Sequence, residues 1–151
     1  MIIAAFVSYA HFLAFFAITT ALVLQLTLIS ESISVEIAKR IQRADLAYGI
    51  FALLLLIFGF LRVFYFEKGA DYYFSNVFFL LKLGLFVLVG LMSLYPTIIY
   101  RRWNSELKQN IAPDLSTQQV FLLRRIIHTE LVGILVLLLC ASMMARGLGS
   151  F

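Results

Sequence analysis

Four long apolar stretches alternate with short polar ones along the chain. They cover residues 2–29, 46–66, 75–100 and 126–145, and each is longer than the ~18 apolar residues that mark a membrane span. At about 1.5 Å per residue, each can cross a ~30 Å hydrocarbon core as a helix. None shows the period-two alternation of a β-barrel strand. The pattern predicts an all-α polytopic membrane protein, a single domain over residues 1–151 folded as an up-and-down four-transmembrane-helix bundle.

The composition agrees with a membrane chain and excludes several other classes. Hydrophobic residues make up 63% of the sequence against about 45–50% in soluble domains, and charged residues 13% against about 25%. A single cysteine, Cys140, excludes a framework of intrachain disulfides. The net charge of +4 does not indicate nucleic-acid binding, because no loop has the length or the mix of aromatic and basic residues of such a surface. We therefore expect the lipid bilayer as partner and no nucleic acid.

Basic residues gather in two of the three linkers, residues 30–45 and residues 101–125. Eight lysines and arginines lie there, whereas at most three lie on the opposite side. Because cytoplasmic loops carry an excess of Lys and Arg, we expect both linkers in the cytoplasm and both termini on the outer, periplasmic side of the inner membrane. The eight residues are Lys39, Arg40, Arg43, Arg101, Arg102, Lys108, Arg124 and Arg125.

Local patterns add detail near the membrane surfaces. Ile33, Ile37 and Ile41 recur at helical spacing between charged positions, which predicts an amphipathic extension of the first helix or a helix along the headgroups. Gly84 and Gly90 are expected to permit close approach of another helix. Aromatic residues are expected to mark the two interfaces, the outer one by Tyr72 and Tyr73, the inner one by Tyr100 and Trp103.

Ionisable side chains inside the apolar segments are functional candidates, because each costs at least ~2.5–3.5 kcal/mol to insert. His11, Arg62 and Lys82 all fall in the predicted outer half of the bundle. His11 lies roughly 13 Å below the outer surface at the helical rise, too deep to reach the headgroups. Three potential cations in one layer of low dielectric repel one another unless anions join them.

Two interpretations of this layer follow. In the first, His11 is a neutral imidazole held by a backbone carbonyl or a neighbouring helix, and the cations pair with Glu67 and Asp71 of the outer turn. In the second, an anionic ligand supplies the missing charge. That ligand would be a haem b, with His11 as the metal-binding axial ligand and with Arg62 and Lys82 as partners of the two propionates.

Two further ionisable residues lie in the last apolar segment. Glu130 and His128 are two residues apart, about 200° on a helical wheel, so they face different ways. His128 shares a face with basic residues and is expected at the membrane interface. Glu130 is expected to point into the bundle, where its carboxyl group is either a proton relay or a neutral hydrogen-bond donor between helices.

Six stretches carry a resemblance to a known family. They are AHFLAFF (10–16), RADLAYGI (43–50), GFLRVFYFEKGADYYFSN (59–76), KLGLFVLVGLMSLYPT (82–97), TELVGILVLL (129–138) and ASMMARGLG (141–149). In these the chain resembles an uncharacterised family of small bacterial four-helix integral membrane proteins, catalogued as a domain of unknown function. The resemblance covers nearly the whole chain and implies the membrane fold, but no assigned activity.

Three shorter motifs carry a more distant resemblance. They surround His11 (YAHFLAF), Lys82 (FLLKLGLF) and Glu130 (RRIIHTELVGI). Here the chain resembles HemJ-type protoporphyrinogen oxidases and CopD-like membrane proteins. The HemJ-type chains have a haem-binding histidine in the first helix, a lysine in a later helix and an Asn-Glu-Pro motif in the last. Thr129 replaces the asparagine and the proline is absent, so the resemblance implies haem binding more than the porphyrinogen reaction.

Three functions stay open. The first is a haem-b-binding redox protein with the haem in the outer half of the bundle and with Glu130 handling protons. The second is a non-enzymatic accessory or scaffold subunit, either as a homo-oligomer or within a larger membrane complex. The third is transport of a proton, an ion or a metal, with Glu130 and His11 as an intramembrane relay.

Overall fold

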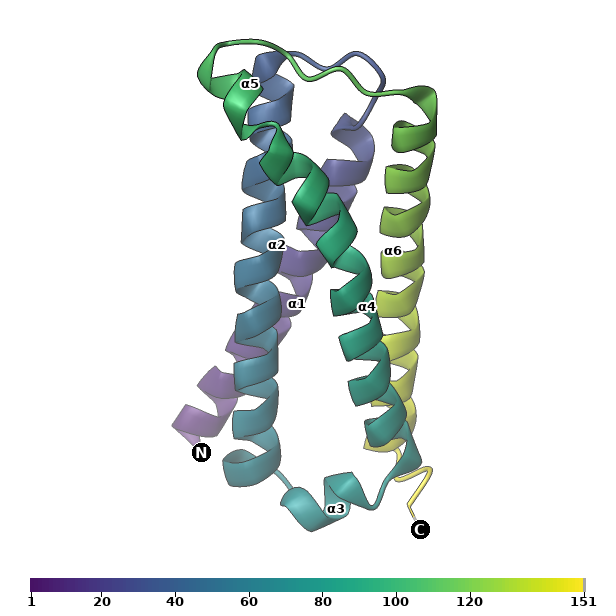
Figure 1. Cartoon of the computed structure of the whole chain (residues 1–151). Helices are drawn as coiled ribbons and strands as arrows, with labels where there is room; N and C mark the ends of the chain where they lie inside the picture. The colour runs from purple at the N-terminus through teal and green to yellow at the C-terminus, as the bar shows by residue number, and fades with distance from the viewer. Residues whose placement is uncertain (151) are drawn as a thin grey trace.

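The computed structural model describes residues 1–150, and its regular elements are helices. The four long helices run up and down in a bundle (Figure 1): α1 (Ile2–Leu28), α2 (Val35–Leu61), α4 (Val77–Arg102) and α6 (Thr117–Ala145). The short elements are η1 (Arg62–Phe66), a π-helix that continues α2, α3 (Ala70–Phe74) and α5 (Asn104–Lys108). Four helices are long and apolar enough to cross a membrane, which confirms the predicted fold class. Phe151, the last residue of the predicted domain, lies outside the described residues.

The bundle consists of two close helix pairs. α1 packs mainly on α2, and α4 packs mainly on α6, while smaller contacts of α1 with α6 and of α2 with α4 join the pairs. Both chain termini and α3 lie at one end of the bundle, here called the terminal end (Figure 1). The α1–α2 connection, α5 and the segment that leads to α6 lie at the opposite end, here called the loop end.

Three of the long helices begin at side-chain caps. Ser34 accepts a hydrogen bond from the backbone N–H of Ile37 at the start of α2, and Asn76 accepts two at the start of α4. At α6, Ser116 and Gln119 form a reciprocal capping box. Each cap satisfies backbone donors that the first helical turn leaves without a partner, so it fixes where the helix begins.

The second helix begins earlier than its apolar pattern predicts. Residues 35–45 belong to α2. Both interpretations of the segment around Ile33 are therefore wrong, because it neither extends α1 nor forms a separate helix along the headgroups. The chain leaves α1 at Leu28, and Ser34 caps a new helix. Ile33 and Ile41 are buried at the loop end, so tertiary packing carries α2 beyond the apolar segment.

A buried cluster closes the loop end. Its members come from α2, α4, α5, α6 and the connecting segments: Ile29, Ile33, Ala38, Ile41, Tyr100, Trp103, Leu107, Leu115, Val120 and Leu123. Tyr100 and Trp103 lie near the end of α4 as expected, but they are 1% and 5% exposed, so they face protein rather than headgroups. Tyr73 at the terminal end is likewise buried.

The close approach of α4 and α6 occurs at a different glycine from those predicted. A Cβ added to Gly133 of α6 would lie 2.7 Å from Cγ2 of Val89 in α4. Nothing lies within 4 Å of a Cβ added to Gly84 or Gly90. Both predicted glycines are exposed on α4 and face away from its neighbours, so the expectation about them is wrong.

Candidate functional site

A cavity of about 460 Å³ lies in the half of the bundle nearer the terminal end. Side chains from α1, α2, η1, α4 and α6 line it, together with residues of the turn that contains α3. His11, Arg62 and Lys82, predicted to share one depth, all line this terminal-end cavity. The rest of its wall is mainly apolar and includes Phe12, Phe15, Phe60, Phe79 and Phe86.

The His11 imidazole is held by a backbone group of the neighbouring helix. Its Nδ1 lies 3.1 Å from the carbonyl oxygen of Leu55 in α2. Because a carbonyl oxygen only accepts, Nδ1 is the nitrogen that donates, and Nε2 carries the lone pair. Within residues 1–150 no protein group hydrogen-bonds to Nε2. The ring sits beside Gly59, where an added Cβ would lie 3.3 Å from its Cε1.

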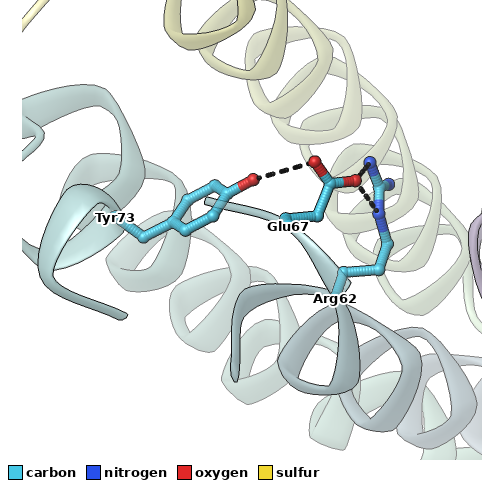
Figure 2. A network of polar contacts seen from close by, with 3 residues as sticks. All are labelled: Arg62, Glu67 and Tyr73. Atoms are coloured by element: carbon cyan, nitrogen blue, oxygen red, sulfur yellow. Dashed lines mark hydrogen bonds and ion pairs between the residues drawn. The ribbon is translucent and has the colours of Figure 1, made fainter. Parts of the chain in front are cut away.

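Arg62 already has an anionic partner. Its Nε and Nη2 donate to Oε1 of Glu67 at 3.1 and 2.7 Å, and the Tyr73 hydroxyl lies 3.5 Å from the other carboxylate oxygen (Figure 2). The guanidinium carbon also lies 5.4 Å from the centre of the Phe12 ring. The first interpretation predicts ion pairs with Glu67 and Asp71. The pair of Arg62 with Glu67 is present, whereas Asp71 forms no ion pair with any residue of the described chain.

Lys82 and Lys68 are the two cations of the cavity wall that have no carboxylate partner among the described residues, and Lys68 lies at the turn, where its Nζ donates to the Tyr72 hydroxyl at 3.2 Å. The Lys82 side chain is half-buried, and its Nζ lies 5.4 Å from the centre of the Phe79 ring. No carboxylate oxygen in the part of the chain that the structure describes lies within 4.0 Å of this Nζ. An ammonium group in an apolar wall is stabilised by an anion placed beside it, and here the protein supplies only an aromatic face.

Glu130 is not part of this cavity. It is 1% exposed, so it points into the bundle as predicted, but it is absent from the cavity wall. The α6 residues of that wall begin at Leu137, seven positions or roughly 10 Å farther along the helix. His128 is exposed, as predicted, with Nδ1 2.8 Å from the Arg124 carbonyl oxygen. The structure thus brings His11, Arg62 and Lys82 together and leaves Glu130 separate.

The sequence did not point to the groups that position His11. The Leu55 carbonyl belongs to the backbone, so no residue type marks it, and Gly59 stands among apolar residues without a turn signal. Asp45 lies three positions before Tyr48 and so shares its helix face. Hydropathy places Asp45 in the linker before the apolar segment, whereas the structure places it inside α2.

A family model for predicted membrane proteins, DUF2214, matches residues 3–149. The chain belongs to the DUF2214 family. No curated protein and no solved structure matches the chain. Membership confirms the expected uncharacterised family of membrane proteins, and with the four apolar helices it supports a multi-pass membrane protein. The likeness of this DUF2214 protein to HemJ-type chains is tested by none of these comparisons and stays a prediction.

Proposed function

We propose that this DUF2214 protein is a haem-b-binding redox protein of the inner membrane, with the haem in the terminal-end cavity. The observation that supports the proposal is the state of His11: Nδ1 is hydrogen-bonded to the Leu55 carbonyl oxygen, and Nε2, at the cavity wall, has no partner among residues 1–150. A histidine that binds a metal through one nitrogen typically donates its other N–H to a carbonyl or carboxylate, which fixes the tautomer and the ring orientation.

The wall of the cavity suits a large, flat, mostly apolar group. Its volume of about 460 Å³ falls within the ~300–1,000 Å³ typical of ligand pockets. Five phenylalanines contribute to the wall, and aromatic faces pack well against a conjugated ring system. When bound, a haem would supply one-electron redox chemistry, while this chain would supply an imidazole ligand and a mainly apolar wall.

The two cations fit the propionates unequally. Among residues 1–150 Lys82 has no carboxylate partner, so it would gain one from a propionate without breaking a pair described there. Arg62 is paired with Glu67, so a second propionate would compete with that carboxylate or share the guanidinium, which has five N–H donors. We therefore assign Lys82 the larger share of propionate binding, and Arg62 the smaller.

The orientation in the membrane is also part of the proposal. The excess of Lys and Arg at the loop end supports a cytoplasmic loop end and termini on the periplasmic side. The haem would then lie in the periplasmic half of the inner membrane.

Titration of the purified protein with haemin in detergent tests the proposal. We expect a saturable Soret band in the wild type and in His128→Ala, and little specific binding in His11→Ala. The chain has two histidines, so His128→Ala is a matched control for the loss of an imidazole. Lys82→Gln should weaken binding more than Arg62→Gln. Equal binding by wild type and His11→Ala would refute the assignment of His11.

Two other predicted functions are not supported by a specific feature of the cavity. These are an accessory or scaffold subunit, acting as a homo-oligomer or in a larger complex, and transport of a proton, an ion or a metal. Both stay predictions.

A further inference from the structure

A second group of polar side chains lies between the terminal-end cavity and the loop end. It joins three helices: Asp45 and Tyr48 of α2, Thr97 and Tyr100 of α4, and Glu130 of α6. We call these five residues the carboxylate cluster. Glu130 and Tyr100 are each 1% exposed and Tyr48 is 6% exposed, while Asp45 is half-buried. The cluster is thus buried at Glu130 and partly open at Asp45.

Two members of the cluster have polar atoms that nothing in the described residues satisfies. They are Oε1 of Glu130 and the hydroxyl oxygen of Tyr100, both buried and without a hydrogen-bond partner. Buried polar atoms are nearly always paired, either with protein or with an ordered water molecule. One atom is a carboxyl oxygen and the other belongs to a hydroxyl, so a water molecule between them could accept from the hydroxyl and donate to the carboxyl oxygen.

A hydrogen bond holds Asp45 against the same stretch of α4 that carries Tyr100. The Thr97 hydroxyl donates to Oδ1 of Asp45 at 2.9 Å, which ties α4 to α2 at this depth. Gln42, one turn before Asp45, reinforces the same contact by donating to the Tyr100 carbonyl oxygen at 2.6 Å. Glu130 lies close enough to Asp45 for their two carboxyl groups to interact electrostatically, and it lies near the neutral phenols of Tyr48 and Tyr100.

Glu130 has no cationic partner in the part of the chain that the structure describes. Among residues 1–150 it forms no ion pair, and the nearby Arg101 acts on Asp45 instead. The remaining long helix, α1, carries no titratable side chain after His11, so it adds no charge near Glu130. A carboxylate buried at low dielectric without a counter-ion is costly, so Glu130 either keeps a proton or binds a cation. A hard metal ion requires about six oxygen ligands, more than this cluster offers at Glu130, which favours the proton.

We propose that Asp45 and Glu130 form an intramembrane proton-exchange pair, with Asp45 exchanging protons with water at the loop end. A proton leaves one carboxyl group and is taken up by the other carboxylate through a water molecule held by Glu130 and the Tyr100 hydroxyl. Nothing is oxidised or reduced in this step. The inference does not depend on haem binding, since the cluster lies outside the terminal-end cavity and shares no residue with its wall.

Infrared spectroscopy of the protein in lipid bilayers tests the pair directly. We expect a carbonyl stretch of a protonated carboxylic acid that is lost in Glu130→Gln and that shifts on transfer from H₂O to D₂O. Carbon-13 labelling of glutamate separates this band from aspartate bands, and it provides the assignment if Glu130→Gln does not fold. Asp45→Asn should leave the band in place but slow its deuterium exchange by about 100-fold, the size of effect that a positioned proton-transfer group supplies.

A control variant and a second test variant complete the experiment. Glu36→Gln removes an exposed carboxylate from the same helix and should leave the exchange rate unchanged. Tyr100→Phe removes the hydroxyl that would hold the water molecule and should slow exchange, although the fold is retained. An unchanged exchange rate in Asp45→Asn would overturn the proposal. So would a glutamate band that shows Glu130 ionised, or one that responds to added Na⁺ or Mg²⁺, because the cluster would then be a cation site.

Discussion

The contact between Gly133 and Val89 gives the most specific stability prediction for the bundle. In Gly133→Ala the new methyl group would lie 2.7 Å from Cγ2 of Val89. Carbon atoms pack best at about 3.5–4.0 Å, so α4 and α6 would have to separate by about 0.8–1.3 Å, or Val89 would have to rotate. Rotation is costly, because a valine in a helix has one strongly preferred rotamer.

The control for this change is Gly90→Ala, one position along α4 from Val89. Nothing lies within 4 Å of a Cβ added at Gly90. Both variants gain the same helix propensity, up to about 1 kcal/mol, so the difference between them isolates the steric effect. Overpacking of this kind typically costs about 1–3 kcal/mol, and we expect Gly133→Ala to be less stable than Gly90→Ala by that amount.

Unfolding in mixed micelles of a mild detergent and SDS would measure the difference. Trp103, the one tryptophan of the sequence, is 5% exposed, so its fluorescence reports loss of the loop-end cluster. Combining Gly133→Ala with Val89→Ala should recover stability relative to the sum of the two single changes, because the second substitution removes the clashing atom. Equal stability of Gly133→Ala and Gly90→Ala would show that α4 and α6 do not approach as described.

Two further predictions concern the terminal end. Asn76 is fully buried, caps α4 and donates to the Leu148 carbonyl oxygen at 2.9 Å. Asn76→Ala should therefore lower the free energy of unfolding by about 1–3 kcal/mol in the same assay. A decrease below about 0.5 kcal/mol would contradict this. Burial, and then the Glu67 carboxylate, raise the pKa of Tyr73 above its usual 10.0. The unfolded chain therefore loses the phenol proton first, and the stability of wild type relative to Tyr73→Phe should fall as the pH rises above about 10. A pH-independent difference between the two proteins would contradict this.

Much of the fold was predictable because a bilayer imposes simple requirements. Spans must be long, apolar and helical, and the sequence meets those requirements four times. The ends of the helices were less predictable, since they depend on packing outside the apolar segments. α2 begins at Val35 because Ser34 caps it and because Ile33 and Ile41 bury themselves in the loop-end cluster. Hydropathy alone indicates neither the cap nor the burial of these two isoleucines.

For the candidate sites, the depth of each residue in the membrane was predictable from the sequence, whereas the contacts between helices were not. The common depth of His11, Arg62 and Lys82 followed from counting residues along helices, and all three line one cavity. Contacts between neighbouring helices cannot be predicted in this way, because packing sets the rotation and the register of each helix. For this reason the Leu55 carbonyl beside His11 and the nearness of Asp45 to Glu130 emerged only from the structure.

The measurement that most directly tests the central claim is the haem content of the protein purified from haem-replete cells. The account predicts a Soret band and about one haem b per chain in the wild type and in His128→Ala, with the band absent from His11→Ala although that variant folds and inserts normally. A colourless wild-type preparation without metal, or a His11→Ala variant that keeps its haem, would contradict it.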